Sequence, residues 1–310
     1  MRHYGEIHDY DDDKKMIKQD NRMSMIRKIA LIAFLFVAWA GKAHPGGEAW
    51  YKVISFNIRY DNPGDKENRW DNRKEELCRT MQKYSPDLLG MQEVLHRQLL
   101  YITGELTEYA HVGIGREDGK ERGEYSPILY KKERFELLES HTFWLSEDPD
   151  AVGKKGWDAA CERIVTWAKL KERASGKVCY VFNTHFDHVG VIAQRESAGL
   201  LKRKIREIAG DFPVIVMGDF NVTPDSEPIA LLTDGEHPDQ LVSVYTATPL
   251  LKGPHHTFHQ FGRLPRERRK IIDHVFVKSG SSVGVVHIID NEETTRYISD
   301  HYPVMALVRI

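Results

Sequence analysis

Two short motifs in the second half of the chain place carboxylate, amide and imidazole groups close together. They are Gly218-Asp219-Phe220-Asn221 and Ser299-Asp300-His301. Groups of these kinds can hold a hard divalent cation, accept a proton from water and donate hydrogen bonds to an oxyanion. Each motif alone is also typical of a turn, because Asp and Asn side chains bond to nearby backbone groups. Their meaning therefore depends on the polar residues that accompany them.

Further polar residues stand at the ends of predicted core strands. The β-branched and aromatic run at 51–56 ends at Asn57, and the apolar run at 87–92 ends at Glu93. Other candidates with the same chemistry are Glu124, Thr184-His185, Asp187-His188 and Asp273-His274. Strand bodies are buried, so residues at strand ends can converge on one rim without burying unpaired charge. Independent turns and caps have no reason to produce this set, which predicts one polar site.

The elements that must position these residues alternate between strands and helices. Strands are predicted at 51–56, 87–92, 125–130, 135–145, 163–170, 178–184, 212–217, 271–277, 283–289 and 304–308. Helices are predicted at 71–84, 97–106, 194–208 and 228–232. The polar loop at 116–123 is expected to face solvent because of its composition. Strands that dominate, with helices interspersed, favour two packed sheets with helices outside.

Composition limits the kind of protein this can be. The chain has 310 residues, of which 41% are hydrophobic, enough for one large α/β domain with a sizeable core. A formal net charge of -2 argues against binding of nucleic acid by bulk charge, which requires a strongly basic balance. Cys78, Cys161 and Cys179 lack the paired spacing of a zinc site. They are expected to be buried small hydrophobes, with a Cys161–Cys179 bridge left open.

The N-terminal segment has the pattern of a cleaved signal peptide. Arg27-Lys28 precedes an apolar run at 29–39, and small residues follow at Ala40 and Ala43. The run is too short to span a membrane comfortably, because a span needs about 20 apolar residues. We therefore expect an N-terminal extension and signal peptide at 1–43 and a catalytic domain at 44–310. The protein is expected to be secreted or periplasmic, without a stable membrane anchor.

Taken in order, six motifs resemble those of the endonuclease/exonuclease/phosphatase, or deoxyribonuclease-I-like, superfamily. They are Ser55-Phe56-Asn57-Ile58-Arg59, Met91-Gln92-Glu93-Val94, Asn183-Thr184-His185, Gly218-Asp219-Phe220-Asn221, Ile272-Asp273-His274 and Ser299-Asp300-His301. Asp187-His188 followed by Gln194-Arg195 is similar to the deadenylase-type branch, and Trp144-Leu145-Ser146 with Gly156-Trp157 resembles secreted bacterial members. The resemblance implies an α/β (α+β) fold, a four-layer sandwich in which two packed mixed β-sheets are flanked by helices. It also implies a metal site at one end.

The resemblance and the chemistry of phosphate esters together suggest the metal and its ligands. A phosphodiester is an anion, so attack by water requires neutralisation of its charge. Hard oxygen ligands suit Mg²⁺ (or Mn²⁺), which keeps several waters and uses few carboxylates. We expect Glu93 to be the principal ligand, with Asn57 and Asp300 helping directly or through water.

Other residues are expected to activate water and to stabilise the leaving group. Asp273 would orient His301, because a carboxylate on one ring nitrogen fixes the tautomer. Either His301 or Asp219 would take the proton of the attacking water, and that choice stays open. Glu124 and His185 match a second catalytic pair of deoxyribonuclease-like members. His185 would protonate the leaving oxygen or donate to a phosphate oxygen.

Three residues are assigned to substrate binding. Asn221 would contribute a neutral donor to the phosphate, in addition to a catalytic role. Arg163 would bind the phosphate in a bidentate way, the alternative being an ordinary arginine on a strand surface. Tyr125 is the third residue that we assign to substrate binding.

These residues predict a metal-dependent phosphoesterase that hydrolyses phosphodiester bonds in a nuclease-like manner. The expected substrate is a nucleic acid or a nucleotide, which basic residues at 263–270 could contact, and the expected state is a monomer. Three alternatives stay open: a sphingomyelinase-type phospholipase C, a phosphomonoesterase acting on a small phosphorylated substrate, and a binding module without catalysis. A membrane-acting phospholipase would need an apolar, aromatic-tipped loop, which the polar loops near Glu117 and Pro265 do not offer.

Overall fold

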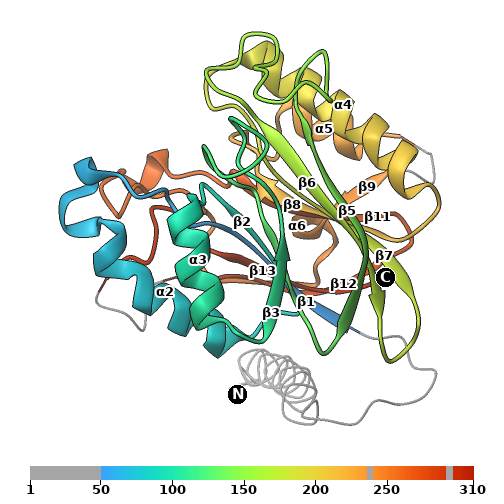
Figure 1. Cartoon of the computed structure of the whole chain (residues 1–310), viewed down its shortest axis with the longest axis horizontal. Helices are drawn as coiled ribbons and strands as arrows, with labels where there is room; N and C mark the ends of the chain where they lie inside the picture. Colours follow the sequence, from blue (N-terminus) through green and yellow to red (C-terminus); the bar gives the residue numbers. More distant parts are fainter. Residues whose placement is uncertain (1–49, 236–239, 291–295) are drawn as a thin grey trace, which may run out of the picture. The chain divides into compact units, whose positions relative to one another are not determined.

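The computed structural model describes residues 50–235, 240–290 and 296–310 (Figure 1). The signal peptide and the domain boundary predicted within 1–49 lie outside the described residues. In the described ranges, no helix is long and apolar enough to cross a membrane. Cys78, Cys161 and Cys179 are all free, so the bridge left open between the last two is not formed. Cys78 and Cys179 are buried as expected, whereas Cys161 is half-buried.

Two mixed β-sheets form the centre of the described part of the chain. The first has seven strands in the order β10-β12-β13-β1-β2-β4-β3, and the second has six in the order β5-β6-β7-β8-β11-β9. The strands of the first sheet are β1 (Trp50–Asn57), β2 (Leu88–Gln92), β3 (Tyr109–Val112), β4 (Ile128–Lys131), β10 (Leu250–Lys252), β12 (Ser282–Ile288) and β13 (Val304–Arg309). Those of the second sheet are β5 (Phe135–Trp144), β6 (Ile164–Glu172), β7 (Val178–His185), β8 (Val214–Asp219), β9 (Leu241–Ser243) and β11 (Asp273–Lys278).

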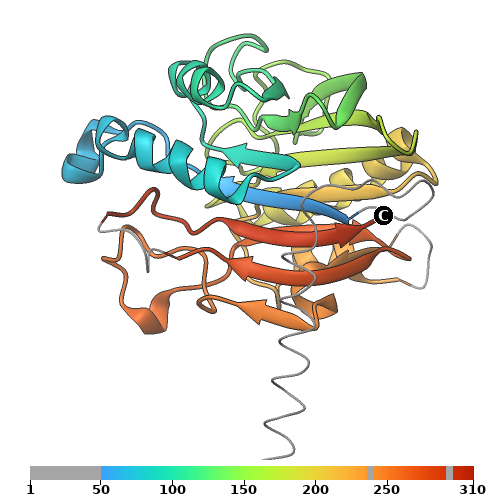
Figure 2. The same ribbon diagram turned by 90° about the horizontal axis from the view of Figure 1, so that it is seen from below.

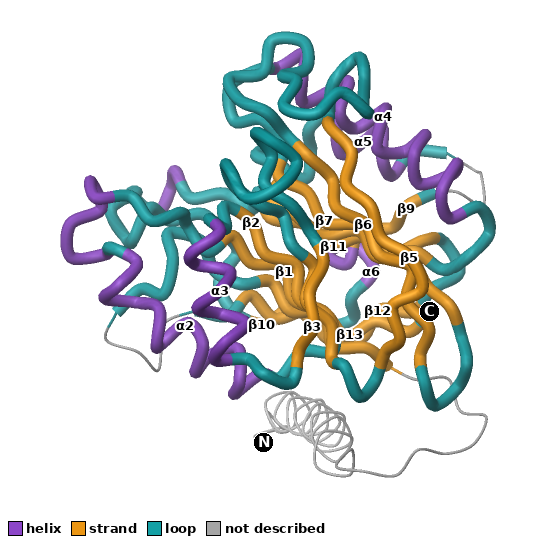
Figure 3. The backbone as a smooth tube through the Cα atoms, viewed as in Figure 1, coloured by secondary structure: helices purple, strands orange, loops and turns teal. Residues whose placement is uncertain are grey.

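Helices cover the outer faces of both sheets, as Figures 1, 2 and 3 show. They are α2 (Trp70–Tyr84) and α3 (His96–Glu105) on the first sheet, and α4 (Val191–Ala209) and α5 (Glu227–Thr233) on the second. The short helix α6 (Val244–Ala247) instead packs its Val244 in the cluster between the sheets, and the 3₁₀ helices η1 (Pro63–Asn68) and η2 (Arg266–Arg268) lie in loops. Leu77 of α2 packs in a cluster with Ile54 of the first sheet. Leu201 of α4 packs in a cluster with Phe276 of the second. The predicted four-layer α/β sandwich is therefore confirmed.

The core follows from the alternation of side chains along each strand. Val53 of β1 packs between the two sheets, in a cluster with Ile215 of β8 and Val304 of β13. Its neighbour Ile54 faces the other way, in a cluster with Met81 of α2. The central strands thus bury two apolar faces, which explains why their segments are nearly continuous apolar runs.

Most elements lie close to where the sequence predicts them. The four predicted helices correspond to α2, α3, α4 and α5, and the hairpin predicted around residue 175 is the antiparallel pair of β6 and β7. The strand predicted at 125–130 begins only at Ile128, because Pro127 before it has no N–H to donate to a ladder. The sequence did not predict β3, β9, α6 and β10, which have three or four residues each and show no period.

The close approach of the two sheets at Gly90 yields a prediction on stability. A Cβ at this position in β2 would overlap Met217 Sδ and lie 2.9 Å from Asn183 Cγ. Gly90→Ala should therefore lower the free energy of unfolding by about 1–3 kcal/mol, measured by urea denaturation. The control is Gly104→Ala in α3, where a Cβ meets nothing within 4 Å and should stabilise by up to about 1 kcal/mol. Equal stability of Gly90→Ala and the unsubstituted chain would contradict this packing.

Candidate active site

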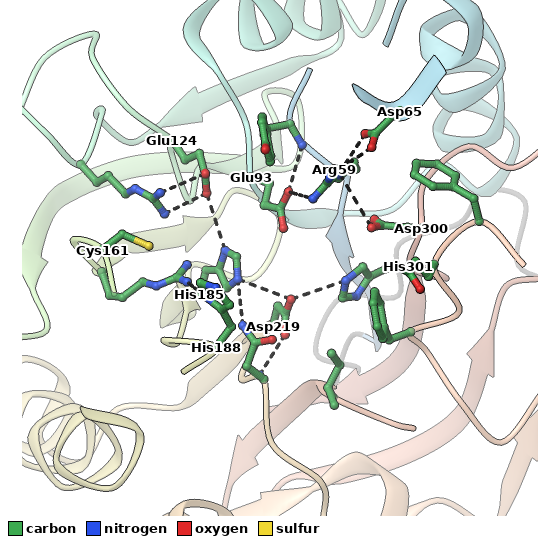
Figure 4. Close-up of a pocket in the computed structure, with 18 of the residues that line it drawn as sticks. Arg59, Asp65, Glu93, Glu124, Cys161, His185, His188, Asp219, Asp300 and His301 are labelled. Carbon is green, nitrogen blue, oxygen red and sulfur yellow. Dashed lines mark hydrogen bonds and ion pairs between the residues drawn. The ribbon is translucent and has the colours of Figure 1, made fainter. Parts of the chain in front are cut away.

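A cavity of about 520 Å³ lies beyond the ends of β1, β2, β7 and β8 (Figure 4). The residues assigned from the sequence that line it are Glu93, Glu124, Arg163, His185, Asp219, Asn221, Asp300 and His301. Asn57 and Asp273 do not line it, but they are bonded to residues that do. The convergence predicted from strand ends is therefore what the structure shows.

Five of the lining residues have a left-handed backbone that non-glycine residues rarely adopt: Gln260 and Phe261, and three that follow strands. The φ angle is 58° at Arg59, 59° at Glu93 and 53° at Asn221, which follow β1, β2 and β8. All three side chains line the cavity. Backbone strain of this kind costs about 1–3 kcal/mol per residue and persists only where surrounding contacts maintain it, often at functional sites.

A buried arginine holds two of the loops that carry this site. Arg73 of α2 donates to the carbonyl oxygens of Arg59 at 2.6 Å and Ile298 at 3.0 Å, and also to that of Ile58. Burial lowers the pKa of its guanidinium to about 10, against the opposing effect of Asp300. Arg73 still carries its charge at neutral pH. It therefore ties the loop after β1 to the loop before β13, a role that its place within a predicted helix did not reveal.

Asn57 bridges two carboxylates. Its fully buried amide donates through Nδ2 to Glu93 Oε1 at 3.1 Å and to Asp219 Oδ2 at 2.9 Å. Its oxygen Oδ1 accepts the backbone N–H of Arg59 at 2.9 Å. Both Nδ2 and Oδ1 of Asn57, a predicted metal ligand, therefore have hydrogen-bond partners within the protein. In this arrangement it positions Glu93 and Asp219 and does not itself reach the cavity.

Glu93 and Asp300 are the two carboxylates that fit a hard divalent cation. Arg59 lies between them, with Nη1 3.7 Å from Glu93 Oε2 and Nε 3.9 Å from Asp300 Oδ2, while its short contacts of 2.9 and 3.1 Å go to Asp65. Burial raises the pKa of Asp300, and the charge of Glu93 adds to that effect although His301 opposes it. A divalent cation would relieve this repulsion, and carboxylate oxygens are the donors it prefers.

Asp273, His301 and Asp219 form a buried chain of titratable groups. His301 Nδ1 lies 2.8 Å from Asp273 Oδ2, and His301 Nε2 lies 3.8 Å from Asp219 Oδ2. Burial by itself would lower the pKa of His301, but the carboxylates of Asp273 and Asp219 outweigh it and raise the pKa to about 10. Burial and Asp273 raise the pKa of Asp219 to about 7. The orientation of His301 by Asp273 expected from the sequence is present.

His185 lies at the centre of the cavity wall as a neutral imidazole. Burial, followed by the charges of Arg163 and Arg116, holds the pKa of His185 well below its ordinary value. Its Nε2 accepts a hydrogen bond from Asn221 Nδ2 at 3.0 Å, which leaves the proton on Nδ1. The neutral state does not suit the proton-donor role considered from the sequence. The other expected role of His185, donation of a hydrogen bond to a phosphate oxygen, is compatible with a proton on Nδ1.

Two arginines on the cavity wall are paired with carboxylates. Arg116 makes two parallel bonds to Glu124, at 2.8 and 3.0 Å. Arg163 Nε donates to Asp187 Oδ2 at 3.2 Å, and Arg163 Nη2 lies 2.9 Å from His188 Nδ1. Arg163 is 4% exposed, so it is not the strand-surface arginine of the alternative interpretation. Arg116 lies in the loop expected to face solvent, yet its side chain is only 12% exposed, because Glu124 draws it inward.

Tyr125, assigned to substrate binding, does not line this cavity. Its ring is 4% exposed, and its hydroxyl lies 2.9 Å from both His96 Nδ1 and the Lys120 carbonyl oxygen. The hydroxyl therefore holds the loop after β3 in place. A tyrosine beside Glu124 in the sequence does not share its direction, because successive residues of an extended segment point to opposite sides.

Two clusters among the described residues have acid, histidine or cysteine ligand atoms within 4.8 Å of one another. One consists of Asp219, Asp273 and His301, in which His301 Nδ1 lies 2.8 Å from Asp273 Oδ2 and His301 Nε2 lies 3.8 Å from Asp219 Oδ2. The other consists of Cys161, Asp187 and His188. In this second cluster the Asp187 carboxylate accepts hydrogen bonds from backbone N–H groups at 2.8 and 2.9 Å and from the Arg163 guanidinium at 3.2 Å. Arg163 is positively charged, and the hydrogen bonds use lone pairs of Asp187 that a metal would need, so both disfavour a metal at this cluster.

Comparison with known proteins identifies relatives of this arrangement. Residues 54–301 match the Endonuclease/Exonuclease/phosphatase family. The crystal structure of an endonuclease/exonuclease/phosphatase from Bacteroides vulgatus is 44% identical, with 84% of this chain and 99% of that chain covered and a TM-score of 0.81. A mannosyl-6-phosphatase from Bacteroides thetaiotaomicron is 31% identical, with 84% and 100% covered and a TM-score of 0.77.

Nucleases are also among the similar proteins. A CCR4-Not complex 3'-5'-exoribonuclease subunit from Mycosarcoma maydis is 22% identical to this chain. The match covers 83% of this chain and 50% of that protein, so the chain spans about half of its length. The family match covers the strand-end residues and the cavity that they line. The chain therefore belongs to the endonuclease/exonuclease/phosphatase family of metal-dependent phosphoesterases.

Proposed function

We propose that this cavity hydrolyses phosphate esters with Mg²⁺ or Mn²⁺ held by Glu93 and Asp300. The observation that carries the proposal is the convergence of carboxylates and imidazoles from distant segments on one cavity of about 520 Å³. A cation bound there would neutralise the charge of the phosphate and acidify water. Asn57 positions the Glu93 carboxylate by donating a hydrogen bond to its Oε1.

Asp219 is the residue that we propose to accept the proton of the attacking water. Its pKa of about 7, raised by burial and Asp273, makes it a stronger base than an ordinary aspartate. His301, whose pKa of about 10 keeps it protonated, would donate a hydrogen bond to a phosphate oxygen. We therefore propose Asp219, and not His301, as the general base.

Asn221 and His185 complete the polar wall. Asn221 Nδ2 donates to His185 Nε2 and to the Phe186 carbonyl oxygen, both at 3.0 Å. These bonds turn the Nδ1–H of His185 away from Asn221, toward Glu124, whose Oε2 lies 3.9 Å from Nδ1. We propose that His185 donates to an oxygen of the substrate from this position.

For the substrate we propose nuclease-like hydrolysis of phosphodiesters as the first candidate. It is supported by the similar exoribonuclease subunit and by Arg263, which lines the cavity and begins the basic segment at 263–270. A specific observation favours a second candidate, a phosphomonoesterase acting on sugar phosphates. The mannosyl-6-phosphatase is more similar in sequence, and the match covers all of its chain.

We also propose that the chain is exported as a monomer after removal of the leader. The apolar run at 29–39 and the small residues after it support the export and the removal of the leader. Intact mass of the exported protein should place its N-terminus after Ala40 or Ala43. An uncleaved N-terminus in the exported protein would overturn the proposal.

The metal proposal predicts a loss of activity with chelator. EDTA should abolish hydrolysis of a chromogenic phosphodiester and of a sugar phosphate, and Mg²⁺ or Mn²⁺ should restore it. Glu93→Gln should raise the Mg²⁺ concentration for half-maximal rate by about tenfold or more, since one anionic ligand is lost. Glu139→Gln, on an exposed position of β5, is the matched control. Activity that persists in EDTA would sink the metal mechanism.

The proposed base predicts a specific loss of turnover. Asp219→Asn should lower kcat by about 100-fold to 10,000-fold while the melting temperature stays the same or rises, because a buried carboxylate becomes neutral. Asp225→Asn, in the exposed turn that follows, should leave kcat unchanged. Near-normal turnover of Asp219→Asn would show that another group accepts the proton.

The two substrate candidates are separated by relative rates. The first predicts a higher kcat/KM on single-stranded RNA or a dinucleotide than on mannose 6-phosphate. The second predicts the reverse. Equal and low rates on both, with Mg²⁺ present, would exclude both candidates.

A further inference from the structure

The cavity has two unlike halves. Figure 4 shows Asp65, Asp300 and His301 on one side of Asp219. Glu124, Cys161 and His188 lie on the other side. The first half holds the proposed metal ligands and the protonated imidazole. The second half contains Arg116 and Arg163, which have no part in the steps proposed above, and His185.

The arginines of the second half are held in place before any ligand arrives. Arg116 is fixed by its two parallel bonds to Glu124. Arg163 is fixed by Asp187, whose Oδ1 accepts backbone N–H groups of Val189 at 2.9 Å and Gly190 at 2.8 Å. Burial alone would raise the pKa of Asp187, but these backbone donors lower it to about 2. The arginine donors therefore need no rearrangement to bind a substrate, which favours affinity.

Three nitrogen atoms in this half have no hydrogen-bond partner among the described residues. They are Arg116 Nε, Arg163 Nη1 and His185 Nδ1. Each is buried, and a buried donor without a partner costs about 1–3 kcal/mol. Native proteins rarely leave several such donors together unless a ligand or water satisfies them. The cluster thus indicates a ligand group that carries oxygen acceptors.

The balance of charges in the second half limits the chemical class of ligand that it can bind. Glu124 balances Arg116, and Asp187 balances Arg163, so the half offers donors and acceptors without a net positive charge. A second phosphate would meet the Glu124 carboxylate, and an apolar group would leave the donors unpaired. A hydroxyl can accept from an arginine and donate to a carboxylate at once.

We propose that Arg116, Glu124 and Arg163 form a subsite for the hydroxyl groups of the alcohol part of the substrate. The subsite selects sugar-like esters over apolar esters of the same size. This inference rests on the proposed hydrolysis of phosphate esters. A hexose phosphate and the ribose of a ribonucleotide would both supply such hydroxyls.

The first test compares matched esters on the unsubstituted chain with Mg²⁺. The kcat/KM for mannose 6-phosphate should exceed that for cyclohexylmethyl phosphate, which has the same ring size and no hydroxyls, by about 100-fold or more. The same comparison between a ribonucleotide diester and its 2'-deoxy analogue tests whether the hydroxyls come from a ribose. The pair of esters with the larger ratio of kcat/KM shows whether a hexose or a ribose supplies the hydroxyls. Ratios within about threefold in both pairs would overturn the subsite, whereas no hydrolysis of any ester would overturn the proposed function itself.

The second test locates the selectivity. Arg116→Gln should lower the ratio of kcat/KM between the hydroxylated and the apolar ester by at least about tenfold, through KM more than kcat. Arg122→Gln, in the same loop but 73% exposed, is the matched control and should keep the ratio. Arg116→Lys, which retains the charge but loses the planar donors, should also lower the ratio if Arg116→Gln fails to fold. An unchanged ratio in a folded Arg116 variant would overturn the assignment.

Discussion

The amide of Asn57 joins the two sheets at the active site, and the rest of the site depends on it. Asn57 ends β1 of the seven-stranded sheet, where its Nδ2 reaches Glu93 at 3.1 Å, and it reaches Asp219 of the six-stranded sheet at 2.9 Å. Two neighbouring carboxylates repel one another, and a neutral donor shared between them holds both without taking the place of a cation. The separation between the proposed metal ligand and the proposed base therefore follows from one side chain.

Polar contacts between the sheets continue behind Asn57. Gln92 of β2 donates to Asn183 of β7 at 2.7 Å, and Asn183 donates to the carbonyl oxygens of Met91 at 2.7 Å and Pro127 at 2.8 Å. These groups are fully buried, so each unmade bond would carry a desolvation penalty, and only one relative placement of the sheets satisfies them. A fixed placement of this kind can maintain the left-handed backbone found at the strand ends.

Much of this could be predicted from the sequence, because burial of apolar strands forces polar residues such as Glu93 and Asp219 to the strand ends. What could not be predicted depends on partners far along the chain. The composition of the loop at 116–123 indicates solvent exposure, and only the contact with Glu124 turns Arg116 inward. Asn57 has the chemistry of a metal ligand, and only the fold shows that its amide also bonds to Asp219 and to the backbone N–H of Arg59. The shortest strands lack enough residues to show a period.

The proposed function requires that residues from both sheets form one metal-dependent site at the cavity. The most direct test is anomalous diffraction at the manganese edge from crystals grown with Mn²⁺ and phosphate. We expect a manganese peak in contact with the carboxylates of Glu93 and Asp300, with phosphate on the side of Asp219 and His301. A manganese peak at Cys161, Asp187 and His188 instead, with the Glu93 carboxylate unbound, would contradict it.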